Sequence, residues 1–468
     1  MNMPHYDAII LGSGPGGYRA AELLADAGMH TALIERADVG GTCLNIGCIP
    51  TKTLLNSAKL YTHARESAAF GIVTEQVRVD WDAVRKWKET VVQKLRRSLE
   101  STLTKAGVEI VRGSGMLKGP GIVEVLPAAG GEAVLLEAPV IIVATGSAPV
   151  IPPIPGLAGN PAVKDSTAML NLESIPQKLC IIGGGVIGIE FASLYSALGS
   201  QVTVIEMLDE IVPVMEPRMA AMLRMAMKQV TFLRGTKVVE VKGSTVSYEA
   251  KDGARGTLEA DTILISVGRR AVIEGWGAEQ AGLEIKNRAI AVDDRMRTNI
   301  PGIWAIGDVT GKSQLAHAAY RMAEVAAADI IARREGRQSV QRFVAETIPW
   351  ALYSIPEAAG CGLTETEAKA RGYDVAVFSS PYGVSGRFIA ENGFSSPGSI
   401  RIVTERTSGR VLGVHLLGAY ASEQIWGAAL ALEQRATLAM LRDMVFPHPT
   451  VSEVIREAAW TGNPYHKE

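Results

Sequence analysis

The sequence predicts an α/β protein with two strand–helix–strand units for binding dinucleotides and a C-terminal α+β domain. Three observations lead to this fold class. The glycine pattern G-x-G-x-x-G occurs twice, each time after an apolar strand-like run and before a helical stretch. Further apolar runs follow each unit and end in glycine or an acidic residue, which indicates that one unit is inserted into the domain of the other. From about residue 346, alternating strand-like runs replace this pattern.

The first unit contains the complete dinucleotide fingerprint. Its glycines are Gly12, Gly14 and Gly17, and its second strand ends at Glu35. We expect Gly12 to make the tight turn and Gly17 to allow close packing of helix on strand. Gly14 is expected to let the backbone approach a pyrophosphate that lies on the helix N-terminus, and Glu35 to hold ribose hydroxyls. The apolar strand at residues 140–144 then ends in Thr145-Gly146.

The second unit repeats this arrangement. Its fingerprint glycines are Gly183, Gly185 and Gly188, and its second strand ends at Glu206. A later apolar strand closes with Gly268, as the earlier one did with Gly146. A carboxylate at position 206 accepts hydrogen bonds from an adenosine 2′-hydroxyl and repels a 2′-phosphate, and no arginine directly follows it. The sequence therefore favours NAD over NADP in this unit.

Two of the four cysteines, Cys43 and Cys48, lie in the peptide GGTCLNIGCIPTK. An ordinary helix would place their Cα atoms about 8.6 Å apart, from its rise and radius. A disulfide spans no more than about 7 Å, so the backbone must be distorted if they pair. Gly47 and Pro50 permit such a distortion, and free N–H groups nearby would favour thiolate. From the residues alone, a redox pair and a buried structural pair are about equally favoured.

Near the C-terminus, His448 lies between two prolines, and Glu453 follows at what reads as the start of a helix. A histidine oriented by a carboxylate is the arrangement of a base that deprotonates a dithiol. Spacing alone favours a surface or capping pair instead.

Composition narrows the class of protein further. The chain has 468 residues, with 47 basic and 49 acidic side chains, so no strong net charge calls for nucleic acid or an anionic membrane. No apolar run is long enough to cross a bilayer, the N-terminus does not read as a secretory signal, and a cytoplasmic location is expected. Cys180 and Cys361 are predicted to be inert core residues, and no metal site is predicted.

Domain boundaries follow from these patterns. A nicotinamide exchanges a hydride and a dithiol exchanges an electron pair, and a flavin can connect the two, so the unit that carries the cysteines is expected to hold FAD. We predict an FAD-binding domain at residues 1–148 and an NAD-binding domain at 149–270. A central domain that completes the first site is predicted at 271–345, and an interface domain at 346–468. The proline-rich stretch at 148–156 marks the first of these boundaries.

The quoted peptide closely resembles the redox-active motif of the flavoprotein disulfide reductases, and the resemblance covers essentially the whole chain. It includes both fingerprints, Asp308 in the second flavin-contact motif, and the HPTxSE sequence around His448. CLNIGCIPTK and a nicotinamide fingerprint that ends in Gly188 are most similar to the branch that oxidises dihydrolipoamide. Glutathione-reducing relatives usually read CVNVGCVPKK. The tail TGNPYHKE lacks the extra cysteine pair of mercuric reductases and large thioredoxin reductases.

The resemblance implies roles for individual residues. It implies that Cys43 exchanges with substrate, that Cys48 contacts the flavin, and that His448, held by Glu453, serves the disulfide of the other subunit. It also implies that Lys52 sits beside the flavin and pairs with Glu190. Without the resemblance to this family, we would interpret Lys52 as an exposed charge on a helix and Glu190 as part of a solvated helix face.

The activity implied is oxidation of a protein-bound dihydrolipoyl group with reduction of NAD⁺, by a homodimer that carries FAD. The partner implied is a lipoylated carrier protein or domain. The alternatives are an NAD(P)H-dependent reductase of another disulfide and a flavin-binding sensor with a regulatory disulfide. Two positions depart from the family pattern. Phe446 stands where a second histidine is usual, and residues 268–272 read GRRAV in place of GRxPN.

Overall fold

The computed structural model describes residues 3–462, which form two compact units. The first unit contains the chain up to residue 54 together with 82–150 and 268–345. The second contains 55–81, 151–267 and the chain from 346. Both nucleotide-binding sequences fold as predicted, one in each unit, and the predicted fold class is confirmed.

A seven-stranded sheet organises the first unit, in the order β19-β6-β1-β2-β3-β4-β5. Strands β19 to β3 in this order run parallel, whereas β3-β4-β5 form an antiparallel extension. The strands are β1 (Ala8–Leu11), β2 (Thr31–Glu35), β3 (Glu109–Gly119), β4 (Ile122–Pro127), β5 (Val134–Glu137), β6 (Val140–Val143) and β19 (Ile303–Ala305). Strand β1 is buried throughout, as expected for a central parallel strand with both faces covered.

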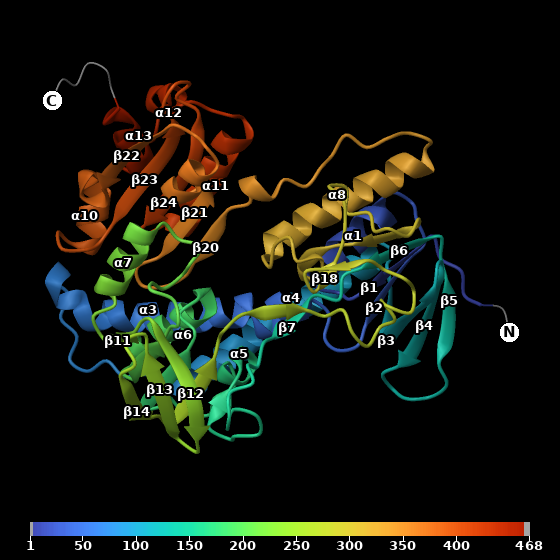
Figure 1. Cartoon of the computed structure of the whole chain (residues 1–468), viewed down its shortest axis with the longest axis horizontal. Coiled ribbons are helices and arrows are strands. Elements are labelled where there is room, and N and C mark those ends of the chain that lie inside the picture. Colours follow the sequence, from blue (N-terminus) through green and yellow to red (C-terminus); the bar gives the residue numbers. More distant parts are fainter. Residues whose placement is uncertain (1–2, 463–468) are drawn as a thin grey trace. The chain divides into compact units, whose positions relative to one another are not determined.

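Helices α1 (Pro15–Asp26) and α8 (Ala316–Arg334) pack against each other beside this sheet (Figure 1). A long helix, α4 (Trp81–Lys105), precedes β3 in the chain. Two small ribbons complete the unit: β7 (Ser147–Pro149) with β16 (Arg269–Ala271), and β17 (Ile285–Lys286) with β18 (Ala289–Ile290). The β7–β16 ribbon joins the two chain segments that lead into and out of the inserted nucleotide unit.

A five-stranded parallel sheet, in the order β11-β10-β9-β15-β8, forms the nucleotide-binding part of the second unit. Its strands are β8 (Val163–Lys164), β9 (Lys178–Ile182), β10 (Gln201–Ile205), β11 (Val230–Leu233) and β15 (Thr262–Ile265). The helices of this part are α5 (Ser166–Met169), α6 (Val186–Ala197) and α7 (Pro217–Ala226). An antiparallel sheet of β12 (Thr236–Lys242), β13 (Thr245–Ala250) and β14 (Arg255–Glu259) follows β11.

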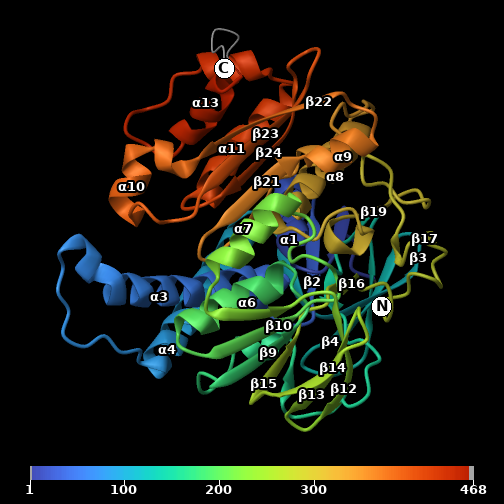
Figure 2. The same ribbon diagram turned by 60° about the vertical axis from the view of Figure 1, so that its left-hand side comes forward.

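The C-terminal part of the second unit is a five-stranded antiparallel sheet in the order β20-β21-β24-β23-β22 (Figure 2). Its strands are β20 (Trp350–Leu352), β21 (Ala358–Gly362), β22 (Val375–Pro381), β23 (Ser399–Glu405) and β24 (Val411–Leu417). Successive residues of β23 face opposite sides. Ile400 and Ile402 share a core with α11 (Ala421–Glu433) and α13 (Glu453–Trp460), whereas Val403 packs in a second core with α9 (Glu365–Ala370). The remaining helices are α10 (Gly386–Asn392) and α12 (Leu438–Asp443).

None of the helices in residues 3–462 combines the length and the apolar character needed to cross a bilayer. Within the same residues, no three histidine, cysteine, aspartate or glutamate side chains lie close enough to hold a metal ion. The cytoplasmic location and the domain boundaries stay predictions, and the tail at 463–468 lies outside the described residues.

Candidate functional site

The connection from β1 into α1 has two positions that accept only glycine. Gly12 has a φ of +101°, and a Cβ built on it would lie 2.4 Å from the carbonyl oxygen of Ala144 on the neighbouring strand. A Cβ on Gly17 would lie 1.8 Å from the carbonyl oxygen of Gly12. Any side chain at either position would force helix and strand apart. The tight turn predicted at Gly12 and the close helix–strand packing predicted at Gly17 therefore both have a steric cause.

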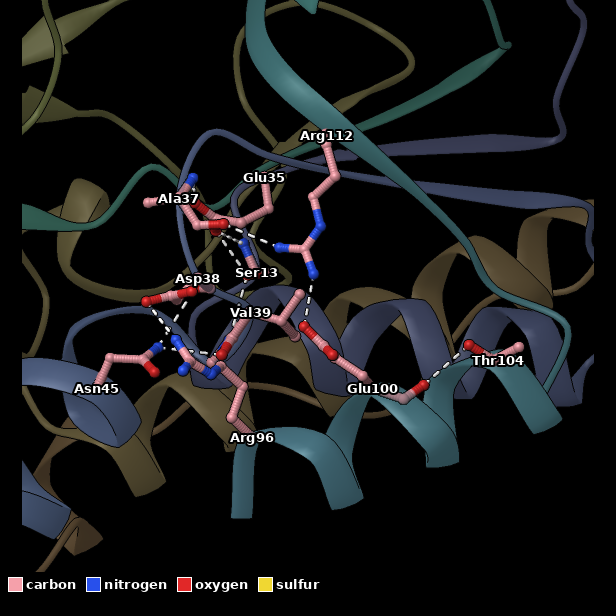
Figure 3. Close-up of polar contacts among 11 residues, drawn as sticks. Ser13, Glu35, Ala37, Asp38, Val39, Asn45, Arg96, Glu100, Thr104 and Arg112 are labelled. Carbon is pink, nitrogen blue, oxygen red and sulfur yellow. Dashed lines mark hydrogen bonds and ion pairs between the residues drawn. The ribbon is translucent and has the colours of Figure 1, made fainter. Parts of the chain in front are cut away.

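The carboxylate of Glu35, at the end of β2, is fixed by hydrogen bonds to the glycine loop (Figure 3). Its Oε2 accepts from the N–H of Ser13 at 3.0 Å and from the Ser13 hydroxyl at 2.5 Å. Its Oε1 accepts from the N–H of Ala37 at 2.8 Å. The acid predicted to bind ribose is therefore held in one orientation before any ligand arrives.

A cavity of about 370 Å³ extends from this acid along the first unit, within the size range of small-molecule sites. Gly14 lines it at the N-terminal end of α1, and a Cβ on Gly14 would meet no atom within 4 Å, because it would point into open space. Thr145 and Gly146 line another part of the wall. The cavity fits a dinucleotide. Its pyrophosphate can lie against the N-terminus of α1, where Gly14 has no side chain in the way, and its ribose can bind the oriented carboxylate of Glu35.

Asp308 takes part in a polar cluster beside the β7–β16 ribbon. Its carboxylate accepts a 2.5 Å hydrogen bond from the Ser147 hydroxyl. Arg269 donates to the same hydroxyl and to the Ser147 carbonyl, both at 2.8 Å. Burial raises the pKa of Asp308 above its ordinary value, while the Ser147 hydrogen bond and the charge of Arg269 oppose that rise. The cluster also places Arg269, the last usual residue before the altered loop sequence, in the flavin-type unit.

Cys43 and Cys48 form a disulfide, with Cα atoms 4.6 Å apart. The backbone is distorted between them, as predicted, because α2 (Gly41–Ile46) ends before Gly47 and α3 (Cys48–Glu66) begins at Cys48. Gly47 has φ −145° and ψ −107°, which is far from helical. Helix α2, which carries Cys43, begins at Gly41, a wall residue of the dinucleotide cavity.

The second glycine loop reproduces the first. A Cβ on Gly183 would lie 2.6 Å from the Ser266 carbonyl oxygen, and one on Gly188 would lie 2.1 Å from the Gly183 carbonyl oxygen. Gly185 again faces open space. Glu206 accepts hydrogen bonds from the N–H of Gly184 at 2.6 Å and of Leu208 at 2.7 Å. This loop therefore fits a second dinucleotide by the same criteria.

Three further predicted residues have defined surroundings. Glu190 lies in α6 and is only 4% exposed, and its Oε1 accepts a 3.1 Å hydrogen bond from the N–H of Tyr353. The alternative of a solvated helix face is therefore wrong for Glu190. Lys52 is half-buried in α3, and its pairing with Glu190 stays a prediction. Gly268 has a φ of +118°, and its carbonyl accepts from the N–H of Val150, so it turns the chain back into the first unit.

His448 and Glu453 form a hydrogen-bonded pair at the start of α13. Nδ1 of His448 lies 2.9 Å from Oε1 of Glu453, and Oε2 of Glu453 accepts from the N–H of Thr450 at 2.8 Å. The carbonyl of Thr450 in turn accepts from the Ser385 hydroxyl. The His448 side chain is 79% exposed and that of Glu453 only 14%. The imidazole is thus held through one nitrogen while most of its surface faces outwards.

This geometry can be compared with that of known proteins. The family model described as pyridine nucleotide-disulphide oxidoreductase matches residues 6–323, and the dimerisation domain of the same family matches residues 348–459. The chain belongs to the pyridine nucleotide-disulphide oxidoreductase family.

Relatives within this family match over nearly the whole chain. A dihydrolipoyl dehydrogenase of Thermus scotoductus is 39% identical over 466 residues, covering 98% of this chain and 97% of that protein. A dihydrolipoyl dehydrogenase of Bacillus subtilis is 37% identical and covers 97% of each chain. Among solved structures, the Cu(II) complex of the HOCl-induced flavoprotein disulfide reductase RclA from Escherichia coli superposes with a TM-score of 0.86. That pair is 29% identical, and the match covers 99% of this chain and 100% of the other.

Other residues of this oxidoreductase shape the site without having been predicted. Ser13 and Ala37 bind the Glu35 carboxylate partly through backbone N–H groups, which any residue supplies and which leave no signal in the sequence. Ser147 and Arg269 are far apart in the chain and meet only because β7 pairs with β16. Phe446, at the departure from the family pattern, packs against the apolar core of the C-terminal domain, so this position serves packing.

The two other cysteines are buried, as predicted. Burial raises the pKa of Cys180 and of Cys361 to about 12 in each case, so both remain thiols at neutral pH. Neither thiol has the exposure or the ionisation that redox chemistry requires. Among the cysteines, all of which are described, the reactive pair is therefore Cys43 and Cys48.

Proposed function

We propose that this oxidoreductase is an FAD-dependent dihydrolipoyl dehydrogenase. It oxidises a protein-bound dihydrolipoyl group to the cyclic disulfide and reduces NAD⁺. The observation that carries this proposal is the Cys43–Cys48 disulfide, whose first cysteine lies on a helix that begins at the wall of the dinucleotide cavity. The chain is similar over nearly its full length to proteins with this activity, which supports the choice of substrate.

The chemistry begins at the disulfide. One thiol of the dihydrolipoyl group loses its proton to the exposed side of His448, and the thiolate attacks the sulfur of Cys43. The Cys43–Cys48 bond breaks and Cys48 leaves as a thiolate. The second dihydrolipoyl thiol then passes its proton to the Cys48 thiolate and attacks the substrate sulfur of the mixed disulfide. The bond to Cys43 breaks, the substrate leaves as the cyclic disulfide, and Cys43 takes up the proton held by His448, so that both cysteines are reduced. Two electrons and two protons have passed from substrate to protein.

Residues of the first unit would hold FAD and residues of the second would hold NAD⁺. FAD would lie along Gly12, Gly14 and Gly17 with its ribose on Glu35, and Thr145, Gly146, Asp308 and Lys52 would complete its site. NAD⁺ would lie along Gly183, Gly185 and Gly188, with Glu206, Glu190 and Gly268 beside it. The chemistry that bound FAD supplies is two-electron transfer between the cysteine pair and the nicotinamide.

The working form is a homodimer, consistent with the dimerisation-domain match. On α11, Trp426 and Leu430 lie one turn apart and are exposed in the single chain, and Met440, Met444 and Val445 around α12 are exposed as well. Large apolar side chains gathered on one domain are typical of a protein interface. The partner during turnover is a lipoylated carrier protein or domain.

The decisive test is steady-state turnover with free dihydrolipoamide and NAD⁺. We expect rapid formation of NADH together with lipoamide in equal amounts. The second candidate is an NAD(P)H-dependent reductase of another disulfide, favoured by the structural similarity to the reductase RclA. That candidate predicts little turnover in this direction and rapid NAD(P)H consumption with a different disulfide. Absence of both activities would leave a flavin-binding sensor.

Replacement of Glu453 by glutamine is expected to lower kcat about a hundredfold, because the imidazole of His448 loses the carboxylate that orients it. The hydrogen bond from the Thr450 N–H, and then that of His448, lower the pKa of Glu453. A lowered pKa means that the ionised form, and the stability it contributes, persists at neutral pH and is lost only as the pH falls through that value. The pH profile of kcat checks this: an unchanged kcat in Glu453→Gln would contradict the role.

Wild-type enzyme is expected to prefer NAD⁺ strongly over NADP⁺, because the Glu206 carboxylate repels a 2′-phosphate. Glu206→Arg should narrow or reverse that preference, by a few kcal/mol at most. Glu206→Gln is the matched control, since its amide oxygen keeps one acceptor for the N–H of Gly184 or Leu208 while the charge is lost. The ratio of kcat/KM for the two coenzymes is the measurement, and equal use of both by the wild type would refute the argument.

A further inference from the structure

Asn45 lies between the two redox cysteines and reaches back to the loop that follows Glu35. Its side-chain Nδ2 donates to three backbone carbonyls: Asp38 at 3.3 Å, Val39 at 3.0 Å and Gly41 at 3.1 Å. Figure 3 shows the Asn45 side chain pointing at this loop from α2. Three acceptors that converge on one nitrogen fix the orientation of the amide, because only the NH₂ end can satisfy them.

Two of the three residues whose carbonyls bind Asn45 line the dinucleotide cavity. Asp38, Gly41 and Asn45 itself line that cavity. The Oδ1 of Asn45 is buried and has no hydrogen-bond partner among the described residues. A buried acceptor without a partner costs free energy. The orientation of the Asn45 side chain therefore satisfies its Nδ2 and leaves its Oδ1 without a hydrogen bond.

Two arginines also brace this loop (Figure 3). Arg96, from α4, forms an ion pair with the Asp38 carboxylate. Arg112, from β3, donates to the Ala37 carbonyl at 2.9 Å and binds Glu100 at 2.5 Å. Residues 37–41 are thus held by side chains from α4, from β3 and from the redox peptide. The contact from the redox peptide depends on the single side chain of Asn45.

We propose that Asn45 is a positioning residue that ties the redox-disulfide peptide to the FAD-binding loop, so that retention of FAD depends on its side-chain NH₂ group. The proposal rests on the proposed function only in assigning FAD to this cavity. Asn45 acts through the loop: it holds the carbonyls of Asp38, Val39 and Gly41, and Asp38 and Gly41 form part of the cavity wall.

Two nearly isosteric variants test this role in the holoenzyme. Asn45→Leu removes the donor, and Asn45→Asp replaces it with an oxygen that faces three carbonyl oxygens. FAD release is followed by the rise in free flavin fluorescence after dilution of the holoenzyme. We expect release to be about tenfold faster in Asn45→Leu, as for loss of hydrogen bonding equivalent to about 1.4 kcal/mol, and faster again in Asn45→Asp.

A residue that only fills space would give a different result. Both variants keep the number and branching of side-chain heavy atoms, and Asn45→Asp also keeps their size, so Asn45→Asp would then release FAD at the wild-type rate. Asn299→Asp is the matched control. Asn299 also donates to a backbone carbonyl, that of Gly282, in the same unit, but it does not line this cavity. Its FAD release should stay at the wild-type rate.

Two further measurements keep the test decisive. If the Asn45 variants fail to fold, Arg112→Met, which removes another of the contacts that hold this loop, should speed FAD release in the same way. Unchanged release in folded Asn45→Asp, or equal acceleration in Asn299→Asp, would overturn the proposal. Purification of wild-type protein that neither contains nor binds FAD would overturn the proposed function instead, so the two failures are distinguishable.

Discussion

Cys43→Ser is expected to lower turnover of dihydrolipoamide by at least about a thousandfold, because the substrate thiolate then has no disulfide sulfur to attack. Cys48→Ser should do the same, since an oxidised pair cannot form without it. The measurement is NADH formation with free dihydrolipoamide. Both variants should still bind FAD, because the glycine loop, Glu35 and the cavity are untouched.

Cys361→Ser is the control for this experiment. Cys361 is buried in β21, where its thiol donates to the Thr347 carbonyl, a contact that a serine hydroxyl can keep. Its activity should remain close to that of the wild type. If Cys43→Ser retained substantial turnover, the disulfide would be structural and the proposed chemistry would have to be abandoned.

A mixture of two inactive variants is expected to regain activity if each site is built from both subunits. Cys43→Ser and His448→Gln should each be nearly inactive as homodimers. In a mixed dimer, a site shared between subunits puts both lesions into one site and leaves the other site wild type. Half of randomly formed dimers are mixed, so activity should approach about a quarter of the wild-type value. The measurement is turnover after co-expression or co-refolding in equal amounts.

The exposure of His448 supports a site that is shared between two subunits. Its imidazole is 79% exposed in the single chain while its partner Glu453 is mostly covered, as expected for a group that completes its surroundings on another subunit. If each chain contained its own complete site, mixing would restore nothing. As a control, mass spectrometry should show that each variant contains no wild-type protein before the two are mixed.

Local patterns with a steric cause could be predicted from the sequence. The turns at Gly12 and Gly183, the strands that end at Glu35 and just before Glu206, and the break at Gly47 all follow from what a chain of these residues can adopt. The strand predicted at residues 140–144 is β6 (Val140–Val143), one residue shorter, because a strand boundary depends on hydrogen bonds that composition does not encode.

Contacts between distant segments could not be predicted in the same way. The pairing of Arg269 with Ser147 depends on the register of β16 against β7, and the clamp by Asn45 depends on the route of residues 38–41. Glu190 has the spacing of an exposed helix residue, and its burial is decided by packing around Tyr353, far along the chain. Such contacts follow from tertiary structure, which a single sequence does not reveal residue by residue.

Glu35 and Glu206, which end or directly follow the second strands of the two nucleotide units, are held by the same pattern of hydrogen bonds. Each carboxylate accepts from an N–H 22 residues earlier in a glycine loop, at Ser13 or Gly184, and from an N–H two residues later, at Ala37 or Leu208. Such agreement is what duplication of an ancestral module and insertion of the copy would leave behind. It also means that neither acid tells a flavin nucleotide from a nicotinamide nucleotide. That discrimination had to evolve in the surroundings added to each copy.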